Sequence, residues 1–271
     1  MRFRISKWLA GAYMVFFILF MLAPIFFVAL NSFNQAKFSI FPPQGFSFQW
    51  YVKLVSLPDF FYAMRNSAII AFSAAVLSTT LGTAAALAIV RGPWRRRELI
   101  QAALMAPLLV PKIVFGIAVF IAAIRVLLYP SFTSIIVAHT VLILPYIMTV
   151  VTANLLQVQR AQEEAAMDLG ANAWQTFRLA TVPQIARGLA TAAVFGFILS
   201  FDEFDISIFL ARAENMTLPL RMFLYMQEME DPTLAAIATV LIAFSIVAVV
   251  LLHKLSKGVN VSDILGRRNT P

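Results

Sequence analysis

Residues 160–188 read RAQEEAAMDLGANAWQTFRLATVPQIARG and form a polar island between long apolar runs. The segment 162–169 is rich in residues that favour helices, and Gly170 suits the position just after a helix end. A second short helix can begin near Asn172 and must end before Pro183, because proline lacks the amide hydrogen that a helix interior needs. So polar a stretch is expected outside the hydrocarbon, at one face of a membrane.

This island carries features of a surface that a partner protein grips. Glu164 and Asp168 are four residues apart and share one helix face, while Ala165 and Ala166 would let another surface approach the backbone closely. Apolar anchors are offered by Leu169, Trp174 and Phe177. The pattern predicts a helix presented to a partner's groove, with a solvated connector between two membrane helices as the alternative.

Composition indicates a membrane protein, since 61% of the residues are hydrophobic and only 13% are charged. Several apolar runs are long enough to cross about 30 Å of hydrocarbon at ~1.5 Å per residue. The first is too long for the core of a signal peptide and is expected to be retained. We therefore expect an all-α membrane protein with six transmembrane helices, in a single domain over residues 1–271. The expected spans are Trp8–Leu30, Ser67–Val90, Leu99–Ile124, Thr133–Ala153, Ile185–Leu210 and Leu234–His253.

Two local features refine these spans. Asn66 precedes the second span and is expected to cap its N-terminus. Pro107 and Pro111 lie inside the third span and are expected to kink or loosen it, because each removes a backbone hydrogen bond.

The net charge of +8 is distributed as in a membrane protein. If the N-terminus is inside, most of the 21 Lys and Arg residues fall on the cytoplasmic side, which places both termini and the loop at about 154–184 there. The cluster Arg95–Arg97 beside Trp94 then anchors the chain at the lipid surface. We expect membrane lipid and no nucleic acid among its partners.

The sequence shows none of the residue patterns that are typical of a catalytic site. Cysteine is absent, which excludes disulfides and thiolate metal sites. The sequence contains no phosphate-binding GxxxxGK[ST] loop, no histidine pair with metal spacing and no nucleophile–base set. We expect no catalytic residue, no metal site and no cofactor, so any energy for transport must come from a separate protein.

Charged residues inside two expected spans are candidates for a solute pathway. Asp202, Glu203 and Asp205 lie near the outer end of the fifth span, where Asp202 and Asp205 would share a helix face. Lys112 follows Pro111 at a similar depth, and its flexible stem could reach one of the carboxylates. Such groups normally face a cavity or a partner. The alternative is carboxylates at the aqueous end of a helix.

The polar island also resembles the cytoplasmic coupling loop of ABC importer permeases. That motif reads Glu-Ala-Ala, three residues, Gly, nine residues, Ile, one residue, Leu-Pro. Ala180 and Val182 depart from it but keep its apolar character, and the matching residues are Glu164, Ala165, Ala166, Gly170 and Pro183. Within this family the acidic run at 202–205 and the external segment 45–51 resemble the spermidine/putrescine branch. Lys112 stands where that branch commonly has an acidic residue.

The resemblance implies a type I ABC importer permease fold in a bacterial inner membrane. A second, homologous permease would complete the pore, two ATPase subunits would drive it, and an extracytoplasmic solute-binding protein would deliver the solute. Contact with the ATPase would involve the motif residues together with Asp168 and Phe177. The expected mechanism is alternating access.

The expected solute is a small organic molecule, with a polyamine or related cationic amine favoured because three acidic groups outnumber Lys112. Pairing of Lys112 with Asp202 or Glu203 would suit an amino-acid-like or mildly cationic solute, whereas a free Lys112 would suit an anionic one. Two further alternatives are a proton-coupled secondary transporter that uses the three carboxylates as relay groups, and a membrane-embedded scaffold.

Overall fold

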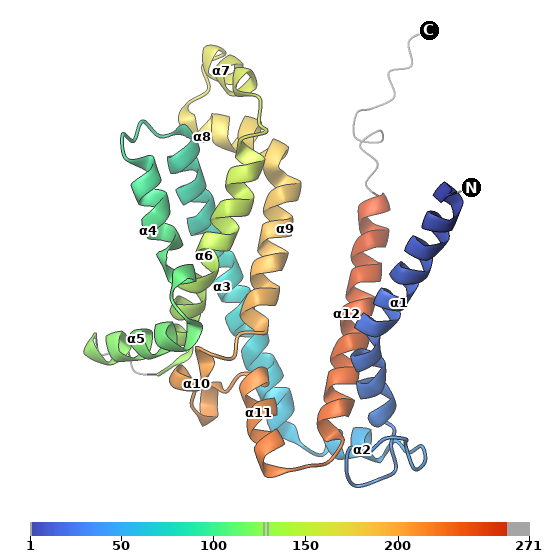
Figure 1. Cartoon of the computed structure of the whole chain (residues 1–271). Helices are drawn as coiled ribbons and strands as arrows, with labels where there is room; N and C mark the ends of the chain where they lie inside the picture. Colours follow the sequence, from blue (N-terminus) through green and yellow to red (C-terminus); the bar gives the residue numbers. More distant parts are fainter. Residues whose placement is uncertain (1, 127, 129, 259–271) are drawn as a thin grey trace. The chain divides into compact units, whose positions relative to one another are not determined.

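The computed structural model describes residues 2–126, 128 and 130–258, which fold into helices joined by loops, with a long loop at 32–48 between the first two helices (Figure 1). The chain divides into two compact units, residues 1–58 with 224–271 and residues 59–223. The basic residues Arg267 and Arg268, expected in the cytoplasm, lie outside the described residues.

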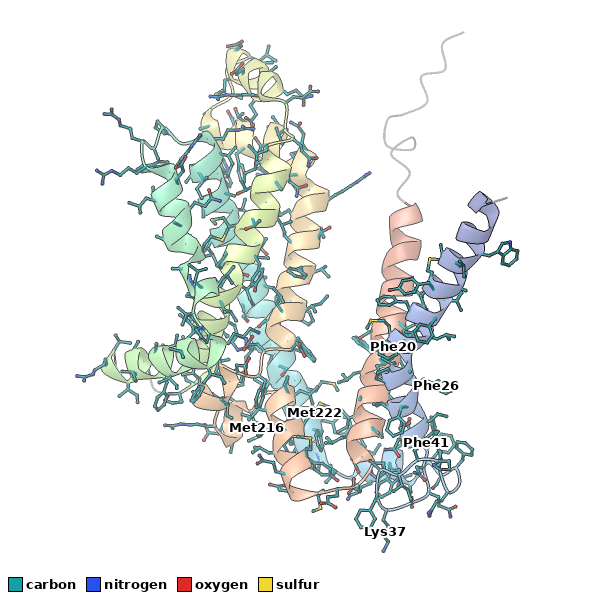
Figure 2. The ribbon with its side chains drawn as sticks, in the orientation of Figure 1. Phe20, Phe26, Lys37, Phe41, Met216 and Met222 are labelled. Carbon is teal, nitrogen blue, oxygen red and sulfur yellow. The ribbon has the colours of Figure 1, made fainter. Side chains whose placement is uncertain are left out.

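The first unit is built around two long helices, α1 (Arg2–Asn31) and α12 (Thr233–Gly258), which contact each other. The short helix α2 (Gln49–Val55) packs against α12. In the 18-residue apolar window within Trp8–Asn31, no residue is buried inside the described structure. Phe20 and Phe26 project from α1 (Figure 2) and are 63% and 66% exposed. A surface of this kind needs lipid or another membrane protein to cover it.

An ion pair outside the apolar stretches ties α2 to the start of α12. Lys53 Nζ lies 2.5 Å from Asp231 Oδ2, and the hydroxyl of Tyr225 donates to the same carboxylate at 3.0 Å. The hydrogen bond to Asp231 raises the pKa of Lys53 above its ordinary value. Burial alone would raise the pKa of Asp231, but the hydrogen bonds from Lys53, Thr233 and Tyr225 outweigh it and lower that pKa. Both groups are therefore held charged.

The second unit contains the longest described helix, α3 (Pro58–Arg91), whose first residue precedes the unit boundary. The remaining helices are α4 (Arg97–Leu109), α5 (Lys112–Arg125), α6 (Phe132–Leu155), α7 (Arg160–Asp168), α8 (Ala173–Thr176), a π-helical turn at Phe177–Thr181, α9 (Val182–Phe201), α10 (Ser207–Leu210), a 3₁₀ turn at Ala213–Asn215, and α11 (Leu218–Glu228), which runs across the unit boundary at 223/224. Helices α6 and α9 pack along each other.

The core of this unit forms where α3, α6 and α9 meet, and it is rich in small and branched side chains. Its fully buried members include Ala74, Ala86, Ile143, Ile147, Ile185 and Ala192. Between membrane helices the driving force is close van der Waals packing, which small residues allow. Gly82 and Gly196 serve this packing, since an added Cβ at either would lie 3.0 Å from a carbon of Ile147.

The all-α membrane class is confirmed, while the number of spans stays a prediction. Four described helices are long and apolar enough to cross a membrane: Trp8–Asn31, Pro58–Arg91, Phe132–Leu155 and Ala173–Phe201. The pair α4 and α5 makes a fifth if counted as one broken span, and the apolar part of α12 at Thr233–Val247 is shorter.

The expected third span is broken instead of kinked. Helix α4 ends at Leu109, Val110 is extended, and α5 begins after Pro111 at an angle of 103° to α4. Proline at 111 forces this exit because it disfavours helical backbone in the residue before it. Pro107, by contrast, is accommodated inside α4.

Two further expectations about helix ends are wrong. Helix α3 begins at Pro58, well before Asn66, and the Asn66 amide donates to the carbonyls of Glu214 and Met216. The fifth span stops at Phe201 instead of reaching Leu210, so Asp202 and Asp205 do not share a helix face. The chain leaves the helix here because the polar groups at 203–207 bond within their own turn.

The close packing around Gly82 yields a stability prediction. In the Gly82→Val variant the new side chain meets Ile147 and the Met148 amide, so α3 and α6 must separate. Overpacking of this kind costs about 1–3 kcal/mol, which should appear as a lower thermal unfolding temperature of the purified protein in detergent. Gly11→Val is the matched control, because nothing lies within 4 Å of that position. Equal unfolding temperatures for the two variants would contradict this account of the core.

Candidate functional site

The segment 160–188 forms a short helix with a defined end. Helix α7 ends at Asp168 with Leu169 as its C-cap, and Gly170 follows with φ +91°, as expected from the sequence. The amide of Gly170 donates to Met167 O at 2.9 Å, and that of Ala171 donates to Ala166 O at 3.1 Å. This pair of bonds is a Schellman motif, which satisfies the last carbonyls of the helix and requires a left-handed residue.

The next helix also begins as expected but continues further. Asn172 accepts a hydrogen bond from the Gln175 amide at 2.9 Å, and the Gln175 side chain accepts one from the Asn172 amide. The sequence predicted that the helical structure would end before Pro183, and this is wrong. Helix α8 ends at Thr176, but the backbone continues through the π-helical turn into α9. Pro183 occupies the first turn of α9, a position at which its missing amide hydrogen costs little.

Most of the residues predicted to meet a partner lie on the open surface of this loop. Glu164, Ala165 and Asp168 are exposed, and Leu169 and Trp174 are 90% and 66% exposed. Ala166 and Phe177 are half-buried, and the Phe177 ring lies 5.6 Å from that of Trp174. Exposed aromatic and aliphatic side chains beside carboxylates are typical of a surface that binds protein.

Glu163, which the sequence analysis missed, is the buried residue of α7. Its side chain is 9% exposed, and Oε2 lies 2.9 Å from Arg91 Nε at the end of α3. Its other oxygen accepts a hydrogen bond from the Thr181 hydroxyl at 2.7 Å. The sequence showed two adjacent glutamates, and only the geometry tells them apart: Glu164 makes an exposed pair with Arg160 at 3.4 Å.

The structure brings together two of the four charged residues predicted for a solute pathway. Lys112 Nζ lies 2.9 Å from Glu203 Oε2, with the Lys112 side chain 51% exposed and that of Glu203 only 2% exposed. The break at Pro111 makes this contact possible, because it places Lys112 at the first position of α5. The expectation that Lys112 reaches a carboxylate is confirmed for Glu203. Its other oxygen lies 3.4 Å from the Ile206 amide.

A buried histidine lies in the same region. His139 on α6 is fully buried, with Nδ1 2.8 Å from Ser200 Oγ and Nε2 3.3 Å from Ser207 Oγ. These contacts join α6 to the end of α9 and to α10, so His139 fixes the segment that carries the acidic run.

Asp202 and Asp205 are placed differently from Glu203. Asp202 is exposed and Asp205 is half-buried. Within the part of the chain that the structure describes, neither carboxylate forms a salt bridge or a side-chain hydrogen bond. The acidic run therefore holds one carboxylate in an ion pair and two outside any described ion pair, of which Asp205 interacts electrostatically with Lys112.

Comparisons with known proteins agree with this architecture. Residues 78–261 match the family described as "Binding-protein-dependent transport system inner membrane component". The chain is 29% identical over 243 residues to the spermidine/putrescine transport system permease protein PotC of Haemophilus influenzae, covering 90% of this chain and 94% of that protein. It is 30% identical over 230 residues to the putrescine transport system permease protein PotI of Escherichia coli K12, covering 82% of each.

A solved structure shows the same fold. The chain aligns with a TM-score of 0.70 and 17% identity to a chain of a bacterial ABC transporter involved in the import of the acidic polysaccharide alginate, covering 94% of this chain and 96% of that one. The relatives and the apolar helices place the protein in the bacterial inner membrane as a multi-pass protein. By its match over residues 78–261, this chain belongs to the family of inner membrane components of binding-protein-dependent transport systems.

Proposed function

We propose that this permease works in an ATP-driven importer, with the loop at about 154–184 as its contact for a separate ATPase subunit. The observation that carries the proposal is the exposed surface of α7 and α8, where Glu164, Leu169 and Trp174 face outward between well-capped helix ends. A short helix with apolar and acidic side chains, held on a folded base, is suited to a groove in a partner.

The family implies ATPase and binding-protein partners in general, and we propose a specific assembly. Two ATPase subunits bind the cytoplasmic side, a second homologous permease completes the pore, and an extracytoplasmic binding protein delivers the solute. The uncovered apolar surface of α1 supports a further membrane partner or a lipid contact, because the described part of the chain buries none of its 18-residue apolar window. Both termini then lie in the cytoplasm, as the basic residues favour.

The proposed mechanism is alternating access. Closure of the ATPase subunits on ATP displaces α7 and α8, and the membrane helices that follow them open the pore toward the outside. Release of the hydrolysis products returns the pore to its inward-open state. The permease supplies no catalytic group in this scheme. It binds the solute and changes conformation when the ATPase subunits displace α7 and α8.

We propose that the solute is a small cationic amine of the polyamine class. The relatives named above are permease proteins of a spermidine/putrescine and a putrescine transport system. Lys112 pairs with Glu203, while Asp202 and Asp205 form no ion pair within the described residues. The run therefore keeps a net negative charge beside Lys112, which disfavours an anion. The sequence linked this pairing to an amino-acid-like or mildly cationic solute, and the relatives favour the polyamine class over an amino acid.

The coupling role predicts a sharp effect at Gly170. Gly170→Pro should abolish uptake while leaving membrane insertion intact, because proline cannot adopt the φ of +91° found there. Glu164→Lys should do the same by reversing the charge of the proposed contact. Uptake into cells and co-purification of the ATPase are the measurements.

Gly170→Asn is the matched control, since asparagine tolerates a left-handed backbone, and it should retain most of the uptake. Normal transport by Gly170→Pro or Glu164→Lys would refute the coupling assignment.

The cytoplasmic position of the loop is tested by labelling. A cysteine introduced at Ala173 of this cysteine-free chain should stay unlabelled by an impermeant maleimide in sealed cells, whereas one at Gln44 should react.

The substrate class predicts a loss of affinity when the carboxylates of Asp202 and Asp205 are removed. Asp202→Asn and Asp205→Asn should each raise the KM for putrescine roughly tenfold, about 1.4 kcal/mol, through loss of an ion pair with the amine. Glu98→Gln, an exposed acidic residue at the start of α4, is the control and should leave the KM unchanged. Uptake competition in cells with the complete transporter checks the class. Competition by an organic anion but by no amine would contradict it.

A further inference from the structure

Four segments of the second unit meet around the ion pair of Glu163 and Arg91. Glu163 projects from the first turn of α7, Arg91 is the last residue of α3, and Thr181 ends the π-helical turn that leads into α9. Arg91 also places Nη2 3.4 Å from the carbonyl of Leu155, the last residue of α6. We name Arg91, Glu163 and Thr181 the Glu163 anchor. It joins α7 to the ends of the three helices that form the core.

The anchor is more buried than the exposed ion pair of α7: Glu163 and Thr181 are buried and Arg91 is half-buried. The side chain of Glu163 is 9% exposed and that of Arg91 is 24% exposed, whereas the neighbouring Arg160–Glu164 pair is 70% and 59% exposed. Water screens a buried pair little, and removal of one partner leaves an uncompensated charge. The buried pair is therefore costly to break, while the exposed one contributes little.

Helix α7 contacts α8 and the π-helical turn, which follow it in the chain. The turn between them, from Gly170 to Asn172, is short and lies at the surface, with no atom within 4 Å of the place a Cβ on Gly170 would occupy. The Glu163 anchor is the buried ion pair that the described structure provides between α7 and α3.

We propose that the Glu163 anchor is a positioning device that transmits the displacement of α7 to α3 and α9. This inference rests on the proposed function, in which an ATPase moves α7. Arg91, Glu163 and Thr181 act through the helices they join and touch neither ATP nor solute. With the anchor intact, α7 moves with the helix core. Without it, α7 follows the ATPase while the core lags, and ATP is hydrolysed with less solute moved.

The test is the number of ATP molecules hydrolysed per putrescine imported, measured in proteoliposomes that contain the assembled transporter with its ATPase, second permease and binding protein. Glu163→Gln keeps an oxygen for Thr181 but loses the ion pair, so the ratio should rise several-fold while the ATPase still co-purifies. Arg91→Gln should have the same effect, and the double variant should be no worse than either single one. Arg187→Gln, an exposed residue of α9, is the control and should keep the wild-type ratio.

A purely structural role would lower transport and ATP hydrolysis together and leave the ratio unchanged, which would overturn the anchor alone. If Glu163→Gln does not accumulate in the membrane, Thr181→Val decides, since it removes one hydrogen bond and leaves the ion pair. It should raise the ratio by a smaller factor, and a wild-type ratio would overturn the inference. A wild-type chain that binds no ATPase would instead refute the proposed function, and the anchor with it.

Discussion

The structure depends on one constraint, which is that a polar group inside hydrocarbon must find its partner within protein. This constraint explains the positions of two breaks in the helices. Pro111 ends one helix and sets Lys112 at the start of the next, and the fifth span stops at Phe201 and turns Glu203 inward. Lys112 Nζ lies 2.9 Å from Glu203 Oε2, so the two breaks together form one ion pair. His139 secures the same turn through Ser200 and Ser207.

The loop at 160–183 follows the opposite rule because it lies in the polar part of the chain. Local hydrogen bonds at Gly170 and Asn172 satisfy the backbone groups at the helix ends, so the outward side chains are not needed to cap the helices. Glu163 is the exception, since it is buried against Arg91. One element thus combines a surface suited to a partner with a buried link to the membrane helices, which is the arrangement that a mechanical connection requires.

Features set by local chemistry could be predicted from the sequence, whereas those set by tertiary contacts could not. Apolar runs gave the all-α membrane class, and Gly170 and Asn172 gave the two helix ends of the loop. The cap assigned to Asn66 was wrong because its amide serves carbonyls about 150 residues away. Glu163 and Glu164 look alike in sequence, and only the approach of Arg91 and Thr181 separates them. The pairing of Lys112 was foreseen from its depth, but its choice of Glu203 depended on where the fifth span ends.

The central claim is that the surface of α7 and α8 is the contact for the ATPase. Its most direct test is a structure by electron cryo-microscopy of the assembled transporter in lipid. The account predicts that Leu169 and Trp174, 90% and 66% exposed in this chain, become buried in a groove of an ATPase subunit. An assembly in which both side chains stay exposed, or in which this loop faces the binding protein, would contradict it.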